Sequence, residues 1–559
     1  MTTYLGISSA HDSSICFYKN GKIEFFLKEE RLTRKKRDKN PIRSLYSFDT
    51  EDEITYCFSV PTINSEWYKL SNTFAAKKYK ITKSYDISNE HHLTHANLAF
   101  YNSGFSEALV VVVDRNGSVA SIGNTLYDTC REAESIYLAK YPNIFQPIYK
   151  NYWKYGPNTN DFIKEISKIY PNCEFHAKSE QSIVKIYESA TSLIMQHMLE
   201  NGKTMGLSAY GNNADYVNFF TNDYIALDYL FSHEYANFNF AGDGFVSINT
   251  ELQNKARKDI NNKNYQLYAD YALQVQKQTQ EALAKLIGKY IEKTGIKNVC
   301  ITGGYGLNVV ANYYLIKSFP DVNFFFEPLA DDSGNSIGAA MKIYRDETLD
   351  KNKYPLSHTF FNGKKYNLNN IKGKQVSIKD VATIISNGKS IAVYYGIAEA
   401  GPRALGNRSI LFDARDPDAK NKVNKIKNRE WYRPFAGMVL ENDADRYFEM
   451  GRIKKSPYMT ISFPVKESAV NIIPGVVHID NTCRIQTIDK SNTYVYDLIK
   501  EFKNITGVGV ILNTSFNLAG EPLVETPEDA IKTLKSSPLD HIWFPEIGIL
   551  ISKSDLLTF

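Results

Sequence analysis

Cysteines are few and long apolar runs are missing, and each of these absences excludes a class of protein. The six cysteines are scattered over 559 residues without a CxxC pair, which argues against a disulfide framework and a cysteine zinc site. No apolar stretch approaches the length of a transmembrane helix. The first residues, MTTYLGISSAHD, lack the features of a signal peptide. We therefore expect a cytoplasmic protein with no membrane partner.

Extreme composition and strong net charge are also missing. With 43% hydrophobic and 23% charged residues, the chain has the composition of a folded protein rather than a disordered one. The net charge of +4, from 66 basic and 62 acidic residues, is too small to establish nucleic-acid binding. A chain of this length exceeds one hydrophobic core, so we expect two or more domains.

Local composition is more informative than the average. The runs RLTRKKRDK (31–39) and KNKVNKIKNREWYR (420–433) are strongly basic, and such runs form either solvated surfaces or phosphate-binding sites. Residues 136–175 are dense in Tyr, Trp, Phe and Lys. They fit either a helical insertion packed on the core or an acceptor-binding region, where rings stack and lysines meet phosphate or hydroxyl groups.

The first third of the chain shows one pattern twice. Residues 4–31 indicate three strands, with the second turn at Asn20-Gly21. Residues 108–127 repeat a buried strand, which ends in Asp114, a turn and another strand. This is how an actin-like or sugar-kinase-like ATPase domain begins, and two such units indicate its duplicated halves.

The middle of the chain contains a glycine turn and then a domain boundary. A long amphipathic segment, 264–294, precedes a pattern of strand, glycine turn and helix over 297–315. Such a turn lets backbone amides approach an anion. The polar, turn-rich stretch that follows predicts a linker at 351–368, between an N-terminal domain at 1–350 and a C-terminal domain at 369–559.

The stretch HHLTHANLAF places three of the ten histidines within five positions. His91 and His95 are four residues apart, so on a helix they share one face. The pair fits either a metal site or packed core histidines. His92 stands where an HExxH metallopeptidase has its glutamate, so the base of that enzyme is missing.

Further motifs follow one another in a fixed order: GISSAHDSS (6–14), EERLTRKK (29–36), HHLTHA (91–96), VVDRNGS (112–118), KTMGLSAYG (203–211), TGGYGLNVVAN (302–312), DDSGNSIGAA (331–340), GPRALGNRSIL (401–411), KNREWYRPFAG (427–437), HIDNTCRIQT (478–487) and NTSFNLAGEP (513–522). Together they closely resemble the O-carbamoyltransferase family, which includes the nodulation-factor, cephamycin and tobramycin carbamoyltransferases. The resemblance covers nearly the whole chain.

The resemblance implies a fold class and a reaction. It implies an α/β actin-like (ASKHA) N-terminal domain, similar to the threonylcarbamoyl-transferring subunit of tRNA modification. It implies a C-terminal α+β domain with a twisted mixed sheet, similar to YrdC. The family consumes carbamoyl phosphate and ATP, the latter with Mg, forms a carbamoyl-adenylate in the C-terminal domain, and passes the carbamoyl group to an acceptor hydroxyl.

The C-terminal motifs provide cations and amides for two polyanions. Arginine matches phosphate oxygens with a rigid fork, so Arg403 and Arg408 are the first candidates for catalysis. The other candidates for nucleotide and phosphate binding are Lys427, Arg429, Arg433, Arg484, Asn513, Ser515 and Asn517.

The N-terminal motifs imply a metal, a nucleotide site and a base. By resemblance, His91, His95, Asp114 and Asp332 hold a divalent metal, with Fe(II) as first choice and Mn or Zn as alternatives. Asp331 competes with Asp332 for this role, and His92 is expected to be structural. The residues expected to line the nucleotide are Lys203, Gly303, Gly304 and Asn308. His11 is the candidate base for the acceptor hydroxyl, with Asp12 nearby either to orient it or to bind the acceptor.

One departure from the family pattern, and the identity of the acceptor, leave alternatives open. Arg115 stands where relatives often have glycine after the strand aspartate, so it either strengthens phosphate contacts or points outward. The acceptor is a hydroxyl of a sugar or antibiotic-type natural product, or a hydroxymethylated pyrimidine in DNA. A tRNA threonylcarbamoyladenosine-type modification enzyme is the alternative function, whereas a non-catalytic nucleic-acid-binding protein leaves the phosphate-site motifs unexplained.

Overall fold

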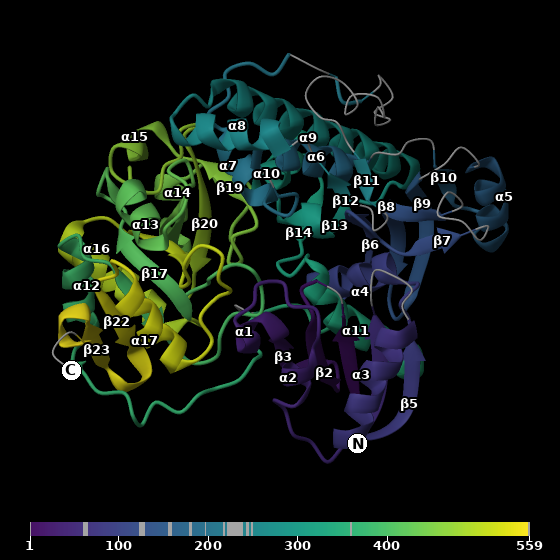
Figure 1. The fold of residues 1–559 in the computed structure, drawn as a ribbon, viewed down its shortest axis with the longest axis horizontal. Helices are drawn as coiled ribbons and strands as arrows, with labels where there is room; N and C mark the ends of the chain where they lie inside the picture. The colour runs from purple at the N-terminus through teal and green to yellow at the C-terminus, as the bar shows by residue number, and fades with distance from the viewer. Residues whose placement is uncertain are drawn as a thin grey trace. The chain divides into compact units, whose positions relative to one another are not determined.

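The structure of the chain is a computed structural model. It describes residues 2–9, 11–59, 65–121, 129–154, 159–177, 182–195, 197–215, 218–220, 239–241, 245–247, 250–357 and 360–556. The chain divides into two compact units (Figure 1): a first unit of Met1–Ile23 with Thr50–Pro355, and a second unit of Glu24–Asp49 with Leu356–Phe559. The division near residue 355 lies within the expected linker, but Glu24–Asp49 group with the second unit. The functional domains at 1–350 and 369–559 stay a prediction.

Two sheets are built from residues 2–326, and five strands of each follow the same order. The first sheet has the order β3-β2-β1-β4-β5, and the second has the order β10-β9-β8-β6-β13-β14 with β7 beside β8. β1 is antiparallel to β2 and parallel to β4, just as β6 is antiparallel to β8 and parallel to β13. The two halves therefore share one design, which confirms the predicted actin-like architecture.

The strand bounds are as follows: β1 (Thr2–Ser8), β2 (Ser14–Lys19), β3 (Lys22–Lys28), β4 (Glu53–Ser59), β5 (Lys80–Asp86), β6 (Glu107–Val113), β7 (Val119–Ser121), β8 (Thr129–Lys140), β9 (Ile144–Lys154), β10 (Glu174–His176), β13 (Asn298–Thr302) and β14 (Asn323–Phe326), with a separate hairpin of β11 (Asn239–Ala241) and β12 (Phe245–Ser247). β2 and β3 are joined at Asn20-Gly21, where both residues have positive φ, as the turn signal predicts.

The helices of the first unit are α3 (Ser65–Lys78), α4 (His91–Ser103), α5 (Thr159–Ile169), α6 (Ile183–Met195), α7 (Asn201–Ser208), α8 (Thr250–Asn261), α9 (Gln266–Thr294), α10 (Val309–Ser318) and α11 (Asn335–Thr348). α4 and α11 pack together closely because residue 338 is glycine; a Cβ there would overlap the Thr94 carbonyl. This approach brings the first turn of α4 to the residues that precede α11, where Asp332 lies.

Residues 136–175 are not mainly a helical insertion. Their first part completes β8 and forms β9, which belong to the second sheet, and of the described residues in this stretch only those of α5 are helical. Ile136, Tyr137 and Ala139 of β8 are buried, and the aromatic Trp153 of β9 is fully buried. The density of Tyr, Trp and Phe in this stretch therefore reflects strand packing, and its proposed acceptor role stays a prediction.

The second unit is a nine-stranded mixed sheet with helices on both faces. The strand order is β15-β23-β22-β16-β17-β21-β18-β20-β19, with β15 (Lys374–Gln375), β16 (Ile391–Tyr394), β17 (Arg408–Asp413), β18 (Ala436–Leu440), β19 (Ser462–Pro464), β20 (Thr482–Ile488), β21 (Val510–Ser515), β22 (His541–Phe544) and β23 (Ile549–Ser552). Its helices are α1 (Glu29–Thr33), α2 (Ile42–Leu45), α12 (Ile378–Ser386), α13 (Ala419–Lys427), α14 (Ala444–Tyr447), α15 (Glu467–Val470), α16 (Thr493–Thr506) and α17 (Pro527–Ser536).

Alternation along the central strand β16 explains the two cores of this sheet. Ile391 and Val393 face a core shared with α12 and α16, whereas Ala392 and Tyr394 face a core shared with α17. A strand buried on both faces reads as a continuous apolar run, which is what residues 391–394 show. The expected twisted mixed-sheet, α+β class is confirmed. Among the described residues, no helix combines the length and apolar character needed to span a bilayer.

Candidate functional site

The centre of the candidate site in the second unit is a buried lysine. Lys427, the last residue of α13, is 3% exposed. Its Nζ donates hydrogen bonds to the Ser515 carbonyl, to Ser515 Oγ at 3.0 Å and to Asn517 Oδ1 at 3.0 Å. Three predicted site residues from two distant motifs therefore form one hydrogen-bonded group at the end of β21.

Arg429 and Arg433 share the electrostatic environment of this lysine, and Arg484 acts on Arg429 in turn. Burial lowers the pKa of Lys427 well below its usual value, and Arg429 and Arg433 lower it further. Burial likewise lowers the pKa of Arg429, with Arg433 and Arg484 adding to the effect. The pKa of Arg484 falls to about 10, mainly through burial. We call Lys427, Arg429, Arg433 and Arg484 the cation cluster. Such mutually repelling cations are stabilised by a bound polyanion.

The sheet register places Asn513 and Arg484 in the same row across three neighbouring strands. Ala436 of β18 lies opposite Asn513 of β21 on one side and opposite Arg484 of β20 on the other. The Asn513 amide donates to the Ala404 carbonyl at 3.0 Å and to Gln486 Oε1 at 3.1 Å. Asn513 thereby ties the GPRALGN loop to the strands that carry the cluster.

The first-choice arginines occupy different environments. Arg408 is fully buried, and its guanidinium donates to the carbonyls of Tyr395, Gly396 and Glu525 while stacking 3.6 Å from the Tyr394 ring centroid. Through these contacts the Arg408 side chain holds the backbone of neighbouring loops in place. Arg403 is only half-buried, two residues beyond Gly401. The catalytic assignment of both stays a prediction.

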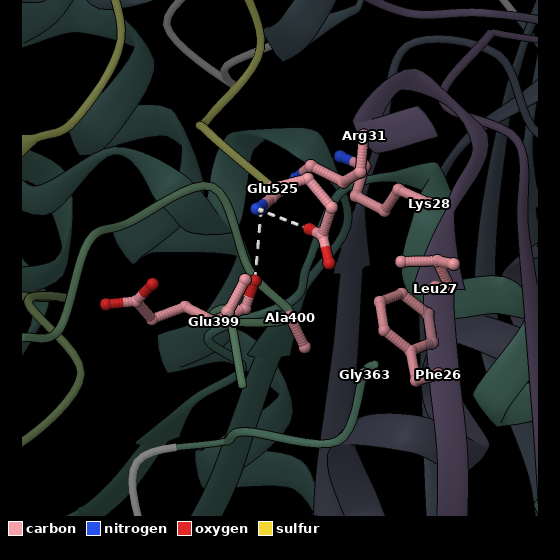
Figure 2. A pocket seen from close by; sticks show the side chains of 9 residues that line it. Phe26, Leu27, Lys28, Arg31, Gly363, Glu399, Ala400 and Glu525 are labelled. Carbon is pink, nitrogen blue, oxygen red and sulfur yellow. Dashed lines mark hydrogen bonds and ion pairs between the residues drawn. The ribbon is translucent and has the colours of Figure 1, made fainter. Parts of the chain in front are cut away.

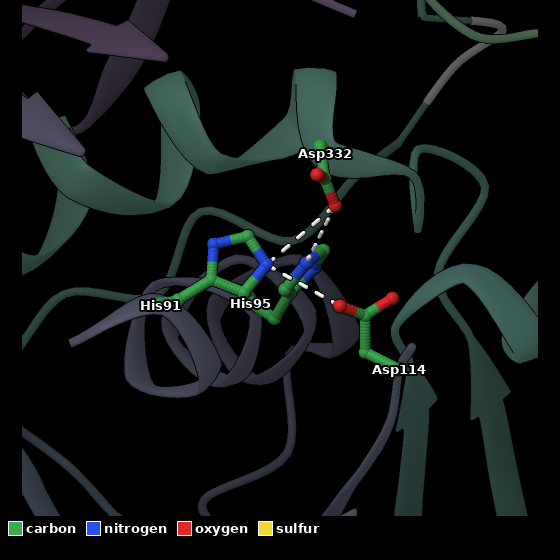
Figure 3. Close-up of side chains that lie close together, drawn as sticks. All are labelled: His91, His95, Asp114 and Asp332. Carbon is green, nitrogen blue, oxygen red and sulfur yellow. Dashed lines mark ion pairs between the residues drawn. The ribbon is translucent and has the colours of Figure 1, made fainter. Parts of the chain in front are cut away.

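A second group of predicted residues comes together in the first unit (Figure 3). His91 and His95 lie on the first turn and a half of α4, Asp114 directly follows β6, and Asp332 precedes α11. His91 Nε2 is 3.4 Å from Asp114 Oδ2 and 3.5 Å from Asp332 Oδ1, and His95 Nε2 is 3.6 Å from Asp332 Oδ1. The four ligand atoms all lie within 4.8 Å of one another.

The chemistry of this group fits a divalent metal. All four side chains are buried, and His91 Nε2 has no hydrogen-bond partner among the described residues although it faces two carboxylates. Burial lowers the pKa of His91, but Asp332 and Asp114 raise it more, to about 10. Two imidazoles and two carboxylates are ligands that iron, manganese and zinc accept. Asp331 instead caps the turn by accepting from the Ser333 amide, which favours Asp332 as the ligand.

The candidate base lies beside this group. His11 Nδ1 is 3.1 Å from Asp12 Oδ2, and His11 Nε2 is 3.5 Å from Asp332 Oδ2. Burial lowers the pKa of His11, but Asp332 and Asp12 outweigh it and raise the pKa to about 9. The ring is therefore protonated at neutral pH unless a cation offsets the charge of Asp332.

The residues of the first unit that are predicted to line the nucleotide differ in their surroundings. Gly303, at a φ of 83°, lies so close to β6 that a Cβ would meet the Val113 carbonyl, and the Gly304 amide donates to Asp114 Oδ1 at 3.2 Å. Asn308 caps α10 and exchanges hydrogen bonds with Gln276, so its amide serves local structure. Lys203 lies on α7, where its Nζ is 3.7 Å from Glu200 Oε2.

Comparison with known proteins decides the family. The family model for the carbamoyltransferase N-terminus matches residues 62–341, and the family model for the carbamoyltransferase C-terminus matches residues 382–551. The chain belongs to the carbamoyltransferase family.

Relatives of this carbamoyltransferase span the whole chain. An uncharacterized protein of Methanocaldococcus jannaschii is 30% identical and covers 98% of this chain and 99% of its own. Nodulation protein NolNO of Sinorhizobium fredii is 29% identical and covers 81% of this chain but 62% of its own length. A solved structure of full-length HypF in the phosphate- and nucleotide-bound form is a looser likeness, with 14% identity, a TM-score of 0.35, and coverage of 62% of this chain and 55% of that one.

The carbamoyltransferase also contains contacts that sequence reasoning missed. Arg115 does not point outward: its Nε lies 2.8 Å from Glu188 Oε1 on α6, and both side chains are largely buried. Asn335 Nδ2 lies 3.0 Å from His95 Nε2. Both partners are distant in sequence, so no motif could have revealed these pairs.

Proposed function

We propose that this carbamoyltransferase is an ATP-dependent O-carbamoyltransferase that works in two steps. Carbamoyl phosphate and ATP give a carbamoyl-adenylate in the second unit, and the first unit passes the carbamoyl group to an acceptor hydroxyl. The observation that carries the proposal is the buried Lys427, held by Ser515 and Asn517 in the field of Arg429 and Arg433. A group of this kind suits two polyanions rather than one neutral metabolite.

In the first step, water releases inorganic phosphate from carbamoyl phosphate and leaves carbamate. A carbamate oxygen then forms a bond to the α-phosphorus of ATP, and the bond to the β-phosphate oxygen breaks, so that pyrophosphate leaves. The cation cluster offsets the negative charges that must approach one another. Arg429, fixed by Asn424 Oδ1 at 2.6 Å and by the Pro434 carbonyl at 3.0 Å, presents its charge without having to reorganise.

In the second step, the acceptor oxygen bonds to the carbamoyl carbon, the bond to the adenylate oxygen breaks, and AMP leaves. The metal that His91, His95, Asp114 and Asp332 would hold, with Fe(II) as our first choice, supplies positive charge for the leaving phosphate. His11 takes the hydroxyl proton at its ring nitrogen once the charge of Asp332 is compensated, and Asp12 orients the ring.

We propose a hydroxyl of a sugar or antibiotic-type natural product as the acceptor, with hydroxymethylated pyrimidine in DNA as the alternative. The two differ in their dependence on salt. Phosphate contacts release counterions, so binding of a DNA acceptor would weaken steeply as salt rises, whereas binding of an uncharged sugar would change little.

The proposal is tested by exchange of labelled pyrophosphate into ATP. Wild-type protein should catalyse exchange only when carbamoyl phosphate is present. Lys427→Ala should reduce exchange by about 100-fold, since a buried cation between two site residues is removed. Lys425→Ala, on the exposed face of the same helix, is the matched control and should retain the wild-type rate. Exchange by wild type that does not depend on carbamoyl phosphate would refute the proposed first step.

A further inference from the structure

The segment EERLTRKK (29–36) is a motif that the proposed function does not yet use. It lies early in the sequence, yet it belongs to the second unit, where it forms α1. α1 ends at Thr33, and the C-cap residue Arg34 takes a left-handed conformation with a φ of 59°. The basic run is therefore not simply a solvated surface, because Arg31 is 3% exposed.

Arg31 connects this segment to the GPRALGN loop (Figure 2). Its Nη2 donates to the Glu399 carbonyl at 3.1 Å and to the Gly401 carbonyl at 3.2 Å. Its Nη1 lies 4.0 Å from Glu525 Oε2, on the loop that follows NTSFN. One buried guanidinium therefore faces both loops that lead into the candidate adenylation site.

The side chain of Glu399 holds the backbone of the GPRALGN loop in place. Its Oε1 accepts hydrogen bonds from the amides of Leu405 at 2.7 Å, Asn407 at 2.8 Å and Arg408 at 3.2 Å. The loop between these residues carries Arg403 and the Ala404 carbonyl to which Asn513 donates. A displacement of the backbone at Glu399 would move this set together.

Arg34 makes the equivalent connection to the loop after NTSFN. Its Nη1 donates to the Leu523 carbonyl at 2.6 Å, its Nη2 donates to the Pro522 carbonyl at 2.9 Å, and its Nε lies 3.5 Å from Asp529 Oδ1. The preceding carbonyl, that of Glu521, accepts from the Asn517 amide at 2.7 Å. Asn517 in turn accepts from Lys427, so the contacts run without a gap from Arg34 to the cation cluster.

A small cavity beside Arg31 shows how this arrangement can be tested. It is lined by Lys28, Arg31, Glu399, Glu525 and neighbouring apolar residues of the second unit (Figure 2). Arg31 Nε and Nη1 and both carboxylate oxygens of Glu525 make no hydrogen bond within the described residues. Removing the Arg31 side chain would enlarge this cavity and leave two backbone carbonyls and a buried carboxylate facing it.

We propose that Arg31 and Arg34 are positioning residues that hold the GPRALGN loop and the loop after NTSFN in the geometry needed for adenylate formation. This inference rests on the proposed function for its catalytic consequence, but not for its structural one. Neither arginine needs to touch substrate. A shift of about 1 Å in groups that bind reacting phosphates costs about 100-fold in rate, which sets the expected size of the effect.

The experiment compares Arg31→Ala, Arg31→Lys and Arg34→Ala with Arg452→Ala, an exposed arginine of the second unit. Hydrogen–deuterium exchange is followed in peptides covering residues 401–408 and 515–525, and carbamoyl phosphate-dependent pyrophosphate exchange is measured in parallel. Arg31→Ala should speed deuterium uptake in the first peptide and lower pyrophosphate exchange by about 10- to 100-fold. Arg34→Ala should act on the second peptide, and Arg452→Ala on neither.

Chemical rescue separates positioning from a general loss of stability. Guanidinium ion at non-denaturing concentration should re-enter the enlarged cavity of Arg31→Ala and restore both slow deuterium uptake and exchange activity. It should not rescue Arg31→Lys, whose side chain still fills the space but cannot fork between two carbonyls.

Unchanged deuterium uptake in both loops of the arginine variants would overturn the inference. If Arg31→Ala does not fold, deuterium uptake in the same two loops of Arg31→Lys and Arg34→Ala tests the inference instead. If wild-type protein shows no pyrophosphate exchange that depends on carbamoyl phosphate, the proposed function is wrong. The deuterium measurement would still decide whether the two arginines position the loops.

Discussion

At the scale of single residues, chemistry in this carbamoyltransferase depends on which charged groups are buried together. His91 and His95 share burial with two carboxylates, whereas His92, one residue away, has a different environment. Burial lowers the pKa of His92 to about 3, and its Nδ1 lies 2.8 Å from Ser135 Oγ, so it is a neutral structural histidine. Adjacent positions on one helix thus serve different purposes because they point to different surroundings.

Removal of one ligand should therefore weaken metal binding selectively. His95→Ala is expected to raise the dissociation constant for Fe(II) by about 100-fold or more, because it deletes one of four grouped ligand atoms. Competition with a chromophoric chelator under anaerobic conditions measures this, with Mn(II) and Zn(II) as comparison ions. His92→Gln is the matched control and should bind like wild type. Equal affinity of wild type and His95→Ala would contradict the assignment.

At the scale of secondary-structure elements, buried polar groups fix where helices begin. The carboxylate of Glu134, on β8, accepts from the Ile183 amide at 2.9 Å, where α6 begins, and from Asn151 Nδ2 at 2.6 Å on β9. It thereby joins one helix and two strands. Burial raises the pKa of Glu134 to about 7, and the two hydrogen bonds only partly oppose this.

This contact makes the stability of the first unit depend on pH. Because the folded-state pKa exceeds the unfolded value of 4.5, the stabilisation is complete below about pH 4.5 and is lost as pH rises through 7. Relative to wild type, Glu134→Gln should gain up to about 3 kcal/mol in free energy of unfolding between pH 4.5 and 8. Urea unfolding across this range measures the gain. Glu292→Gln, exposed on α9, should show none, and a pH-independent difference for Glu134→Gln would refute the role of its titration.

At the scale of the whole molecule, the two groups of site residues lie in different units, so the two chemical steps that we propose should be separable by mutation. His95→Ala combined with Asp332→Ala should spare carbamoyl phosphate-dependent pyrophosphate exchange and block carbamoyl transfer. Lys427→Ala should block both, because the second step needs the product of the first. Mass spectrometry of an offered panel of hydroxylated sugars, antibiotics and hydroxymethylated DNA detects the added carbamoyl group. Equal loss of both steps in the first variant would contradict this division.

Much of the fold and part of the candidate site could be predicted from sequence. The duplicated strand pattern predicted two halves of one design, and the repeated sheet order confirms it. The metal residues and Lys427, Ser515 and Asn517 were named from motifs, and the structure brings each set together. The aromatic stretch 136–175 was mistaken for a helical insertion as one alternative, because buried strands and buried helix segments share composition.

The amino-acid sequence by itself determined the family, the order of strands and helices, and the residue types available for phosphate and metal binding, because these depend on local pattern and motif spacing. Only the tertiary structure decided how those residues are used. It placed residues 29–34 in the second unit, turned the guanidinium of Arg408 toward loop carbonyls, and paired Arg115 with Glu188. Hydrogen bonds and burial between segments that are separate in the sequence set these outcomes, and such contacts leave no local signal in the chain.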